Sequence, residues 1–414
     1  MQEPKRVVVT GLGCITPLGC DVRQMWWKLV AGESGVREIT RFDHSAMSVH
    51  IAAEVKGFEP EKYMNKRAVR RMDLFARYAT ASAVLARDDA GLAIEPECEH
   101  IGAMIASGVG GLQTFEDETR RLIEKGPDRV NPLLIPMMIP NMGAAQVSLT
   151  LGTRGPLSAT CTACAAGSNA IGDAFEILRR GDAVAMFAGG SEAPISPIGV
   201  AGFSAMRALS TRNDAPTQAS RPFDSQRDGF VMGEGAGVLL LEELEHARAR
   251  DAHIYAEIVG YGMSSDAFHM TAPDESGKSQ ARAMRAAMAQ AGVEPSEVGY
   301  INAHGTATPA GDVAETKAIK HAFGEQARSV AISSSKSMIG HCLGGSGGIE
   351  AVITVLTILN GVIHPTINLT DRDSDCDLDF VPLTARKTDV RVAASNSFGF
   401  GGHNVTLIFR RFED

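Results

Sequence analysis

Short apolar runs that end in glycine recur along the first half of the chain. The clearest of them cover residues 6–13, 100–111 and 183–193. An apolar run of this length that stops at a glycine is typical of a buried β-strand followed by a tight turn. Between two of these runs, residues 72–92 carry apolar side chains at helical spacing and reach a helix stop signal at Gly91. Strands that alternate with helices predict a layered α/β fold with buried sheets.

The second half of the chain repeats this organisation. Strand-like runs lead into polar or glycine-rich turns at residues 298–308, 330–340 and 391–402, and helical patterns cover residues 279–293 and 347–361. In both halves, a turn of small residues also opens one long apolar helix. The shared pattern predicts an internal duplication.

The division between the two halves is expected in the charged stretch near residue 250. The small-residue turns with their helices, residues 164–178 and 340–356, then fall one on each side of it. We therefore expect an N-terminal half of residues 1–250 and a C-terminal half of residues 251–414.

The composition narrows the class of protein. A hydrophobic content of 44% in 414 residues is ample for a large core, and a net charge of −9 argues against a nucleic-acid binder. Seven cysteines, an odd and scattered set, argue against a disulfide framework and favour a reducing compartment. With neither a signal-peptide pattern nor an apolar run of 18 or more residues, we expect a soluble cytoplasmic protein without membrane insertion.

Cys161 and Cys164 stand three residues apart and could be a metal half-site, a redox pair or one nucleophile with a bystander. A zinc site needs about four ligands, and the chain has no second pair of this kind. A thioredoxin-like pair needs a small βαβ domain, which this chain does not resemble. The single-nucleophile interpretation is favoured, and no metal site is predicted.

Cys164 is the better nucleophile of the two. Small residues follow it and then an apolar helical pattern begins, so Cys164 is expected at a helix N-terminus, where the backbone N–H groups favour a thiolate. Cys161 is expected in the incoming strand, packed as a small apolar side chain.

Three further residues lie where a cysteine nucleophile could use them. His304 ends a strand-like run, and Lys336 and His341 precede the second glycine-rich helix start. A lone histidine at such a place is usually a hydrogen-bonded structural residue. Two histidines at strand-to-turn positions instead favour chemistry, which tends to sit on loops at strand ends.

Four motifs in order carry a family resemblance: "TAC" at 162–164, "NAHGTAT" at 302–308, "SSKSMIGH" at 334–341 and "SNSFGFGGHN" at 395–404. With the stretches at 221–237 and 261–273, they closely resemble the beta-ketoacyl-[acyl-carrier-protein] synthase family, type II in particular. Two departures concern substrate detail only: Ala307 replaces the usual serine, and "CLGGSGG" replaces "LLGAAGG" after His341.

The resemblance implies a thiolase-like fold, in which two duplicated halves with five-stranded sheets form a five-layer α-β-α-β-α sandwich. It implies a homodimer without an organic cofactor, acting on acyl and malonyl groups carried by acyl carrier protein. The implied reaction is a decarboxylative condensation that lengthens a fatty acyl chain by two carbons through an acyl-cysteine on Cys164.

The resemblance also assigns roles to residues. His304 and His341 would stabilise the enolate. The backbone N–H groups of Cys164 and Phe400 would stabilise the oxyanion. Lys336, anchored by Glu350, would tune the electric field at the site. The remaining assignments cover the phosphopantetheine arm (Thr306, Thr308), the acyl pocket (Val109, Phe203), a glycine-flanked gate (Phe400 with Gly401 and Gly402) and carrier docking (Arg67, Arg70, Arg71, Arg207).

Three other functions were weighed. An inactive partner subunit of the same fold would lack the cysteine, whereas Cys164, His304, Lys336 and His341 are all present. A thiolase would use coenzyme A and different motifs. A polyketide synthase with the same chemistry stays open at this point.

Overall fold

The computed structural model describes residues 3–95 and 98–413. Its frame is a ten-stranded sheet with the order β10-β9-β13-β14-β8-β1-β7-β6-β4-β5. The strands are β1 (Val7–Ile15), β4 (Ile101–Ala106), β5 (Leu157–Ser158), β6 (Ala185–Glu192), β7 (Gly235–Glu243), β8 (Ala256–Ser265), β9 (Val298–Asn302), β10 (Ala331–Ser333), β13 (Val392–Gly399) and β14 (His403–Arg410).

The sheet consists of two halves with the same topology. From the junction of β1 with β8, one half runs β1-β7-β6-β4-β5 and the other β8-β14-β13-β9-β10. In each half the first two neighbours pair antiparallel and the next two parallel. Within this sheet of the described residues, the short antiparallel pairing of β1 with β8 joins the two halves. The predicted duplication is confirmed, with two five-stranded sheets that share one edge.

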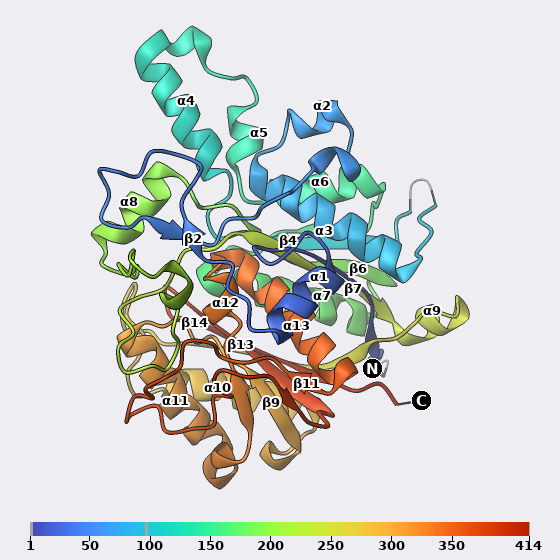
Figure 1. Cartoon of the computed structure of the whole chain (residues 1–414). Coiled ribbons are helices and arrows are strands. Elements are labelled where there is room, and N and C mark those ends of the chain that lie inside the picture. Colours follow the sequence, from blue (N-terminus) through green and yellow to red (C-terminus); the bar gives the residue numbers. More distant parts are fainter. Residues whose placement is uncertain (1–2, 96–97, 414) are drawn as a thin grey trace.

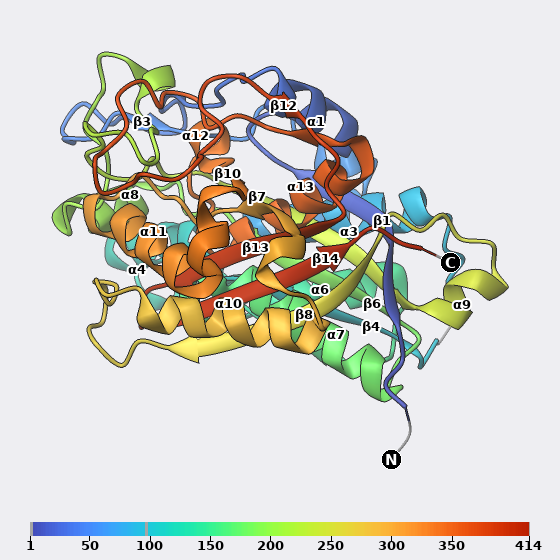
Figure 2. The same ribbon diagram turned by 90° about the horizontal axis from the view of Figure 1, so that it is seen from below.

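Helices complete five layers. The outer face of the first half is covered by α3 (Leu74–Ala90) and α6 (Met142–Leu151), and that of the second by α10 (Lys278–Ala291), with α11 (Pro309–Phe323) beside it (Figures 1 and 2). Between the sheets lie α7 (Ala166–Arg180) and α13 (Ser346–Asn360), which contact both.

The central position of α13 explains its composition. In the described part of the chain, one helical stretch, Leu343–Asn360, has the length and hydropathy of a membrane span, and 89% of it is buried inside the protein. A helix that lies between two sheets has no side that faces solvent, so it carries apolar side chains all around.

The remaining helices and strands lie outside the five layers or connect them. These helices are α1 (Val22–Val30), α2 (Lys66–Val69), α4 (Leu112–Lys125), α5 (Leu134–Met138), α8 (Pro197–Ala205), α9 (Leu244–Ala249) and α12 (Lys336–Ile339). Two small sheets pair β2 (Arg37–Glu38) with β3 (Ile51–Ala52) and β11 (Val362–Ile363) with β12 (Arg386–Lys387).

The strand and helix patterns of the sequence are confirmed where they were strongest. The helix expected over residues 72–92 is α3, whose first turn is capped by the Asp73 carboxylate and which ends at Gly91 with φ of 59°. Glycine adopts this left-handed conformation without the steric cost of a Cβ atom, and it therefore ends the helix cleanly.

Candidate active site

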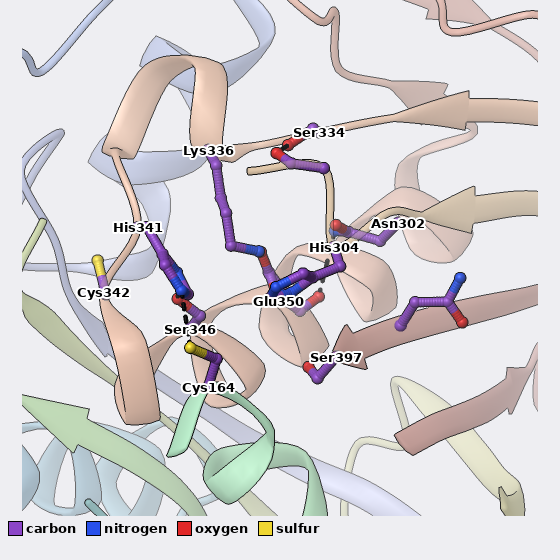
Figure 3. Close-up of polar contacts among 12 residues, drawn as sticks. Cys164, Asn302, His304, Ser334, Lys336, His341, Cys342, Ser346, Glu350 and Ser397 are labelled. Carbon is purple, nitrogen blue, oxygen red and sulfur yellow. Dashed lines mark hydrogen bonds and ion pairs between the residues drawn. The ribbon is translucent and has the colours of Figure 1, made fainter. Parts of the chain in front are cut away.

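Cys164 lies in a short 3-10 turn, η3 (Ala163–Ala165), that leads directly into α7. Its side chain is buried, with 6% exposed. Ala163 has φ of 49°, in the left-handed region that residues other than glycine seldom enter. The prediction that Cys164 stands at the start of a helix is confirmed, and its sulfur faces His341 (Figure 3).

Glycines let the starts of α7 and α13 approach each other closely. A Cβ atom on Gly167 would lie 2.8 Å from the carbonyl oxygen of Gly344, and one on Gly347 only 2.4 Å from the backbone nitrogen of Ser168. No side chain fits at these distances, so the small residues after each turn are required by the packing. This contact brings the turn that precedes α13, in the second half, next to Cys164 in the first.

His341 is the imidazole closest to the thiol. Its Nε2 atom lies 3.0 Å from Cys164 Sγ, and its Nδ1 atom lies 3.1 Å from Ser346 Oγ at the start of α13. The Phe230 ring packs edge-on against it at 5.2 Å. Burial, and then the charge of Lys336, hold the pKa of His341 well below its usual range, so this ring is neutral near pH 7.

His304 follows β9 and meets His341 at right angles, with ring centroids 5.4 Å apart. The backbone N–H groups of His304 and Gly305 donate to the Glu315 carboxylate, over 2.9 and 2.7 Å, which fixes the turn. The Nδ1 atom of His304 is buried and finds no hydrogen-bond partner among the described residues. Burial, and then the charge of Lys336, lower the pKa of His304, so it too is neutral.

Lys336 and Glu350 form a buried ion pair beside the histidines (Figure 3). Their side chains are 1% and 0% exposed. Burial raises the pKa of Glu350 to about 7, and the lysine opposes that rise. The lysine charge is thus held by a carboxylate in the protein interior, where it lowers the pKa of both histidines and of the Cys164 thiol.

The resting thiol of Cys164 is protonated. Burial raises its pKa to about 12, although Lys336 and the backbone N–H groups of Phe400 and Cys164 itself act to lower it. The expectation that the helix start would favour a thiolate is therefore wrong, because burial outweighs the helix terminus. The imidazole nitrogen nearest this thiol is His341 Nε2, 3.0 Å from Sγ.

These groups meet in a largely apolar cavity that opens to solvent. Eight of the sixteen predicted site residues line it: Val109, Cys164, Phe203, His304, Thr306, Thr308, His341 and Phe400. Lys336 and Glu350 are buried next to the lining rather than part of it. The Thr306 and Thr308 hydroxyls lie 3.0 Å apart, so both present polar groups to one place in the cavity.

Phe400 begins the turn between β13 and β14, and Gly401 and Gly402 complete it with φ of 82° and 76°. Only glycine adopts two such angles in succession without strain. The turn is also held from outside: Gly401 N–H donates to the Met270 carbonyl over 2.8 Å, and Asp266 N–H to the Gly402 carbonyl over 3.0 Å. Any movement of Phe400 therefore involves the 266–270 loop as well.

The four predicted docking arginines are exposed, but the chain does not gather them in one place. Arg67, Arg70 and Arg71 lie on and just after α2. Arg207 follows α8, and Figure 1 places α2 and α8 apart, on either side of α4 and α5. Within one chain, the basic cluster consists of the first three arginines.

The expectation for Cys161 is wrong. Its side chain is exposed, and it lies in irregular backbone beyond the two-residue strand β5 (Leu157–Ser158) instead of inside a strand. Its Sγ atom lies 3.5 Å from the carbonyl oxygen of Gly108. The strand ends early because it is the edge of the sheet, so residues before Cys164 have no second strand to order them.

Three polar residues that hold this site were missed in the sequence. Ser346 contacts His341, Glu315 holds the His304 turn, and Glu192 accepts hydrogen bonds from the loop that carries Val109. Only Ser346 gave a signal, as the one hydroxyl in the glycine-rich turn "GGSGG". Among the described residues, no group of three or more His, Cys, Asp and Glu side chains is placed to hold a metal ion.

Comparison with known proteins identifies the family. The beta-ketoacyl synthase N-terminal domain matches residues 4–247, and the beta-ketoacyl synthase C-terminal domain matches residues 255–370. The 3-oxoacyl-[acyl-carrier-protein] synthase 2 of Staphylococcus aureus (strain COL) is 53% identical over 414 residues, 100% of both chains. The protein of the same name from Synechocystis sp. is 53% identical over 412 residues, 99% of each chain.

Solved structures agree. A beta-ketoacyl synthase from Burkholderia phymatum STM815 superposes with a TM-score of 0.92 at 39% identity, covering 99% of this chain and 100% of the other. A type II polyketide ketosynthase, solved in complex with its acyl-carrier protein and bound to a hexaketide, gives 0.91 at 34% identity with the same coverage. The thiolase-like fold and the family expected from the sequence are both confirmed: the chain belongs to the beta-ketoacyl synthase family of condensing acyltransferases.

Proposed function

We propose that this enzyme condenses acyl-[acyl-carrier protein] with malonyl-[acyl-carrier protein] to a 3-oxoacyl-[acyl-carrier protein], and so elongates fatty acids by two carbons. The observation that carries the proposal is the meeting of a buried thiol, two neutral imidazoles and a buried lysine–glutamate pair at one apolar cavity. The 53% identity to a 3-oxoacyl-[acyl-carrier-protein] synthase 2 supports the same reaction.

In the first step, Cys164 takes the acyl group. The sulfur attacks the thioester carbonyl, the bond from that carbon to the carrier's sulfur breaks, and the thiol proton is transferred to the leaving thiolate beside His341. The backbone N–H groups of Cys164 and Phe400 lie beside the sulfur and stabilise the oxyanion of the tetrahedral intermediate.

In the second step, the malonyl group loses carbon dioxide. The electron pair of the broken carbon–carboxylate bond forms an enolate, whose oxygen receives hydrogen bonds from the neutral rings of His304 and His341. The enolate carbon attacks the acyl carbonyl and Cys164 leaves as a thiolate, which takes a proton from water. Lys336, paired with Glu350, acts on these groups through the electric field of its charge.

The apolar lining suits a fatty acyl chain. Val109 stands at the far end of the pocket and Phe203 on its wall, with the Phe203 and Phe400 ring centroids 6.5 Å apart. Phe400 lies on the turn that contains Gly401 and Gly402, and its ring gates the pocket. Thr306 and Thr308 hydrogen-bond the amides of the phosphopantetheine arm.

An assay of the unmodified protein tests the proposal. With malonyl carrier protein and saturated acyl carrier proteins of several lengths, mass spectrometry of the carrier is expected to find each acyl group longer by two carbons and carrying a 3-oxo group. Repeated condensation of malonyl units into poly-3-oxo chains, without turnover of saturated acyl groups, would instead assign the chain to polyketide synthesis. Release of free acid alone would refute both.

The assembly belongs to the proposal as well. The relative solved with its acyl-carrier protein supports a carrier partner. A homodimer is supported by exposed apolar side chains at and near the free edge strand β5, where Leu157 is 50% exposed and Leu149 75%. The halves 1–250 and 251–414 would act as one unit, with the nucleophile in the first and the histidines in the second, and we place the enzyme in the cytoplasm.

The basic cluster after α2 is the docking surface for the acidic carrier. Changing Arg70 and Arg71 together to glutamate is expected to raise the Michaelis constant for the carrier substrate about tenfold and to leave kcat nearly unchanged. Binding of the carrier to the unmodified enzyme should weaken as salt is added. Steady-state kinetics at several ionic strengths measures both effects.

The matched control reverses Arg23 and Lys28 on α1, which changes the net charge by the same amount elsewhere. This control should leave the Michaelis constant within about twofold, as expected for charges outside the interface. A Michaelis constant that neither salt nor the Arg70 and Arg71 reversal moves would remove this cluster from the docking surface.

A further inference from the structure

Glu192, the last residue of β6, is completely buried, and it accepts hydrogen bonds at both carboxylate oxygens. One segment that donates to it follows β4, and the other is the turn before α13. The donors are Ser107 Oγ (2.6 Å) and the backbone nitrogens of Gly108 (2.7 Å), Val109 (3.1 Å), Gly110 (3.3 Å) and Gly344 (3.0 Å).

These donors favour the ionised carboxylate. Four of them are backbone N–H groups, which can only donate. Ser107 Oγ accepts from the Gly110 N–H over 3.0 Å, so its own proton is free for Glu192. Burial raises the pKa of Glu192, and the hydrogen bonds oppose that rise. A protonated carboxyl group would turn its own O–H toward other donors, whereas the carboxylate satisfies all of them.

The two segments close around the carboxylate so tightly that each needs a glycine. A Cβ atom on Gly108 would lie 2.8 Å from Glu192 Oε2, and one on Gly344 would lie 2.8 Å from the same oxygen. A Cβ atom on Gly344 would also lie 2.3 Å from the Gly108 nitrogen. The carboxylate thus joins a loop of the first half to a turn of the second.

The joined segments carry functional groups. Val109 lines the catalytic cavity and also a smaller cavity beyond it, formed with Gly111, Leu112, Phe115 and Met138. Val109 is thus shared by the two linings, and an acyl chain that extended from one space toward the other would run beside it. Gly344 lies three residues after His341, whose ring contacts Cys164.

We propose that Glu192 is a positioning residue for acyl-chain selectivity: its carboxylate fixes the Val109 wall relative to Cys164 and His341, and so sets the length of chain that the pocket accepts. The inference rests on the proposed function, because it concerns acyl transfer to Cys164. Glu192 itself touches neither the substrate nor the reacting atoms.

The test is the rate of Cys164 acylation, measured by intact mass, with acyl carrier proteins from short to long chains. Glu192→Gln keeps the shape but turns an NH2 group toward backbone donors, which displaces the Val109 loop. The ratio of long-chain to short-chain acylation rates is expected to change about tenfold. This is the size of discrimination that a hydrophobic pocket makes between chains that differ by a few methylene groups. Ser107→Ala, which removes one donor, should change the ratio in the same direction by less.

Two controls separate selectivity from general damage. Glu242→Gln neutralises another fully buried carboxylate, paired with Arg250 and remote from the cavity lining, and it should leave the ratio unchanged. Iodoacetamide is too small to need the pocket wall. Its reaction with Cys164 should not slow in Glu192→Gln, because the lost carboxylate charge had raised the pKa of the thiol.

Each outcome decides something. If the unmodified protein accepts no acyl group, the proposed function fails and this inference falls with it. If the protein is acylated but Glu192→Gln slows all chain lengths equally, Glu192 is only structural and the inference alone is overturned. If Glu192→Gln does not fold, Ser107→Ala decides: a changed ratio supports the inference, and an unchanged ratio overturns it.

Discussion

Replacing Cys164 by alanine should abolish acyl-enzyme formation and lower condensation by at least about 1000-fold, as removal of a covalent nucleophile does. Cys164 Sγ lies 3.0 Å from His341, and no other cysteine of the described residues lines the apolar cavity. Incubation with acyl carrier protein, followed by digestion and mass spectrometry, measures the adduct and its position.

Cys161→Ala is the matched control. This thiol is exposed, three residues away, and contacts only a backbone carbonyl among the described residues, so the variant should keep most of its activity. Both variants should unfold at nearly the same temperature as the unmodified protein, because alanine fills nearly the space of cysteine. An acyl group found on Cys161, or full activity in Cys164→Ala, would contradict the assignment.

The elements that were predicted correctly are those set by local patterns of apolar residues and glycine. Apolar runs that end in glycine became strands, and the helix over residues 72–92 appeared with its caps. The start of α7 just after Cys164 was predicted from the small residues that precede an apolar helical pattern. The shared pattern of the two halves predicted the duplication that the strand order shows. Neither β1 nor β8 carried a sequence signal for the pairing that joins them.

The features that were not predicted depend on contacts between residues that lie far apart in the chain. Glu192 receives hydrogen bonds from residues more than 80 positions earlier and more than 150 later, and nothing near it announces them. The thiol pKa depends on how deeply the two halves bury Cys164, which is a property of their contact. Cys161 was misplaced because strand propensity alone does not say where an edge strand stops.

His304→Ala and His341→Ala should separate the two halves of the reaction. Each variant should still form acyl-Cys164, whereas malonyl decarboxylation should fall about 100- to 1000-fold, the usual cost of one lost donor to a developing oxyanion. Some slowing of acylation is expected in His341→Ala only, because its Nε2 atom contacts the sulfur and His304 does not approach it so closely in the described contacts. Mass spectrometry of the acyl adduct and carbon dioxide release from malonyl carrier protein measure the two steps separately.

The pH dependence of decarboxylation gives the same assignment a second test. Burial and the Lys336 charge both disfavour the imidazolium form, so the pKa of each histidine lies well below the ordinary value of 6.5. The neutral rings, with one N–H each to donate, therefore persist as the pH falls through 6.5, and the rate should decline only at more acid pH. A rate that halves near pH 6.5, or acylation lost as fully as decarboxylation in His304→Ala, would show that these histidines do not stabilise the enolate as neutral donors.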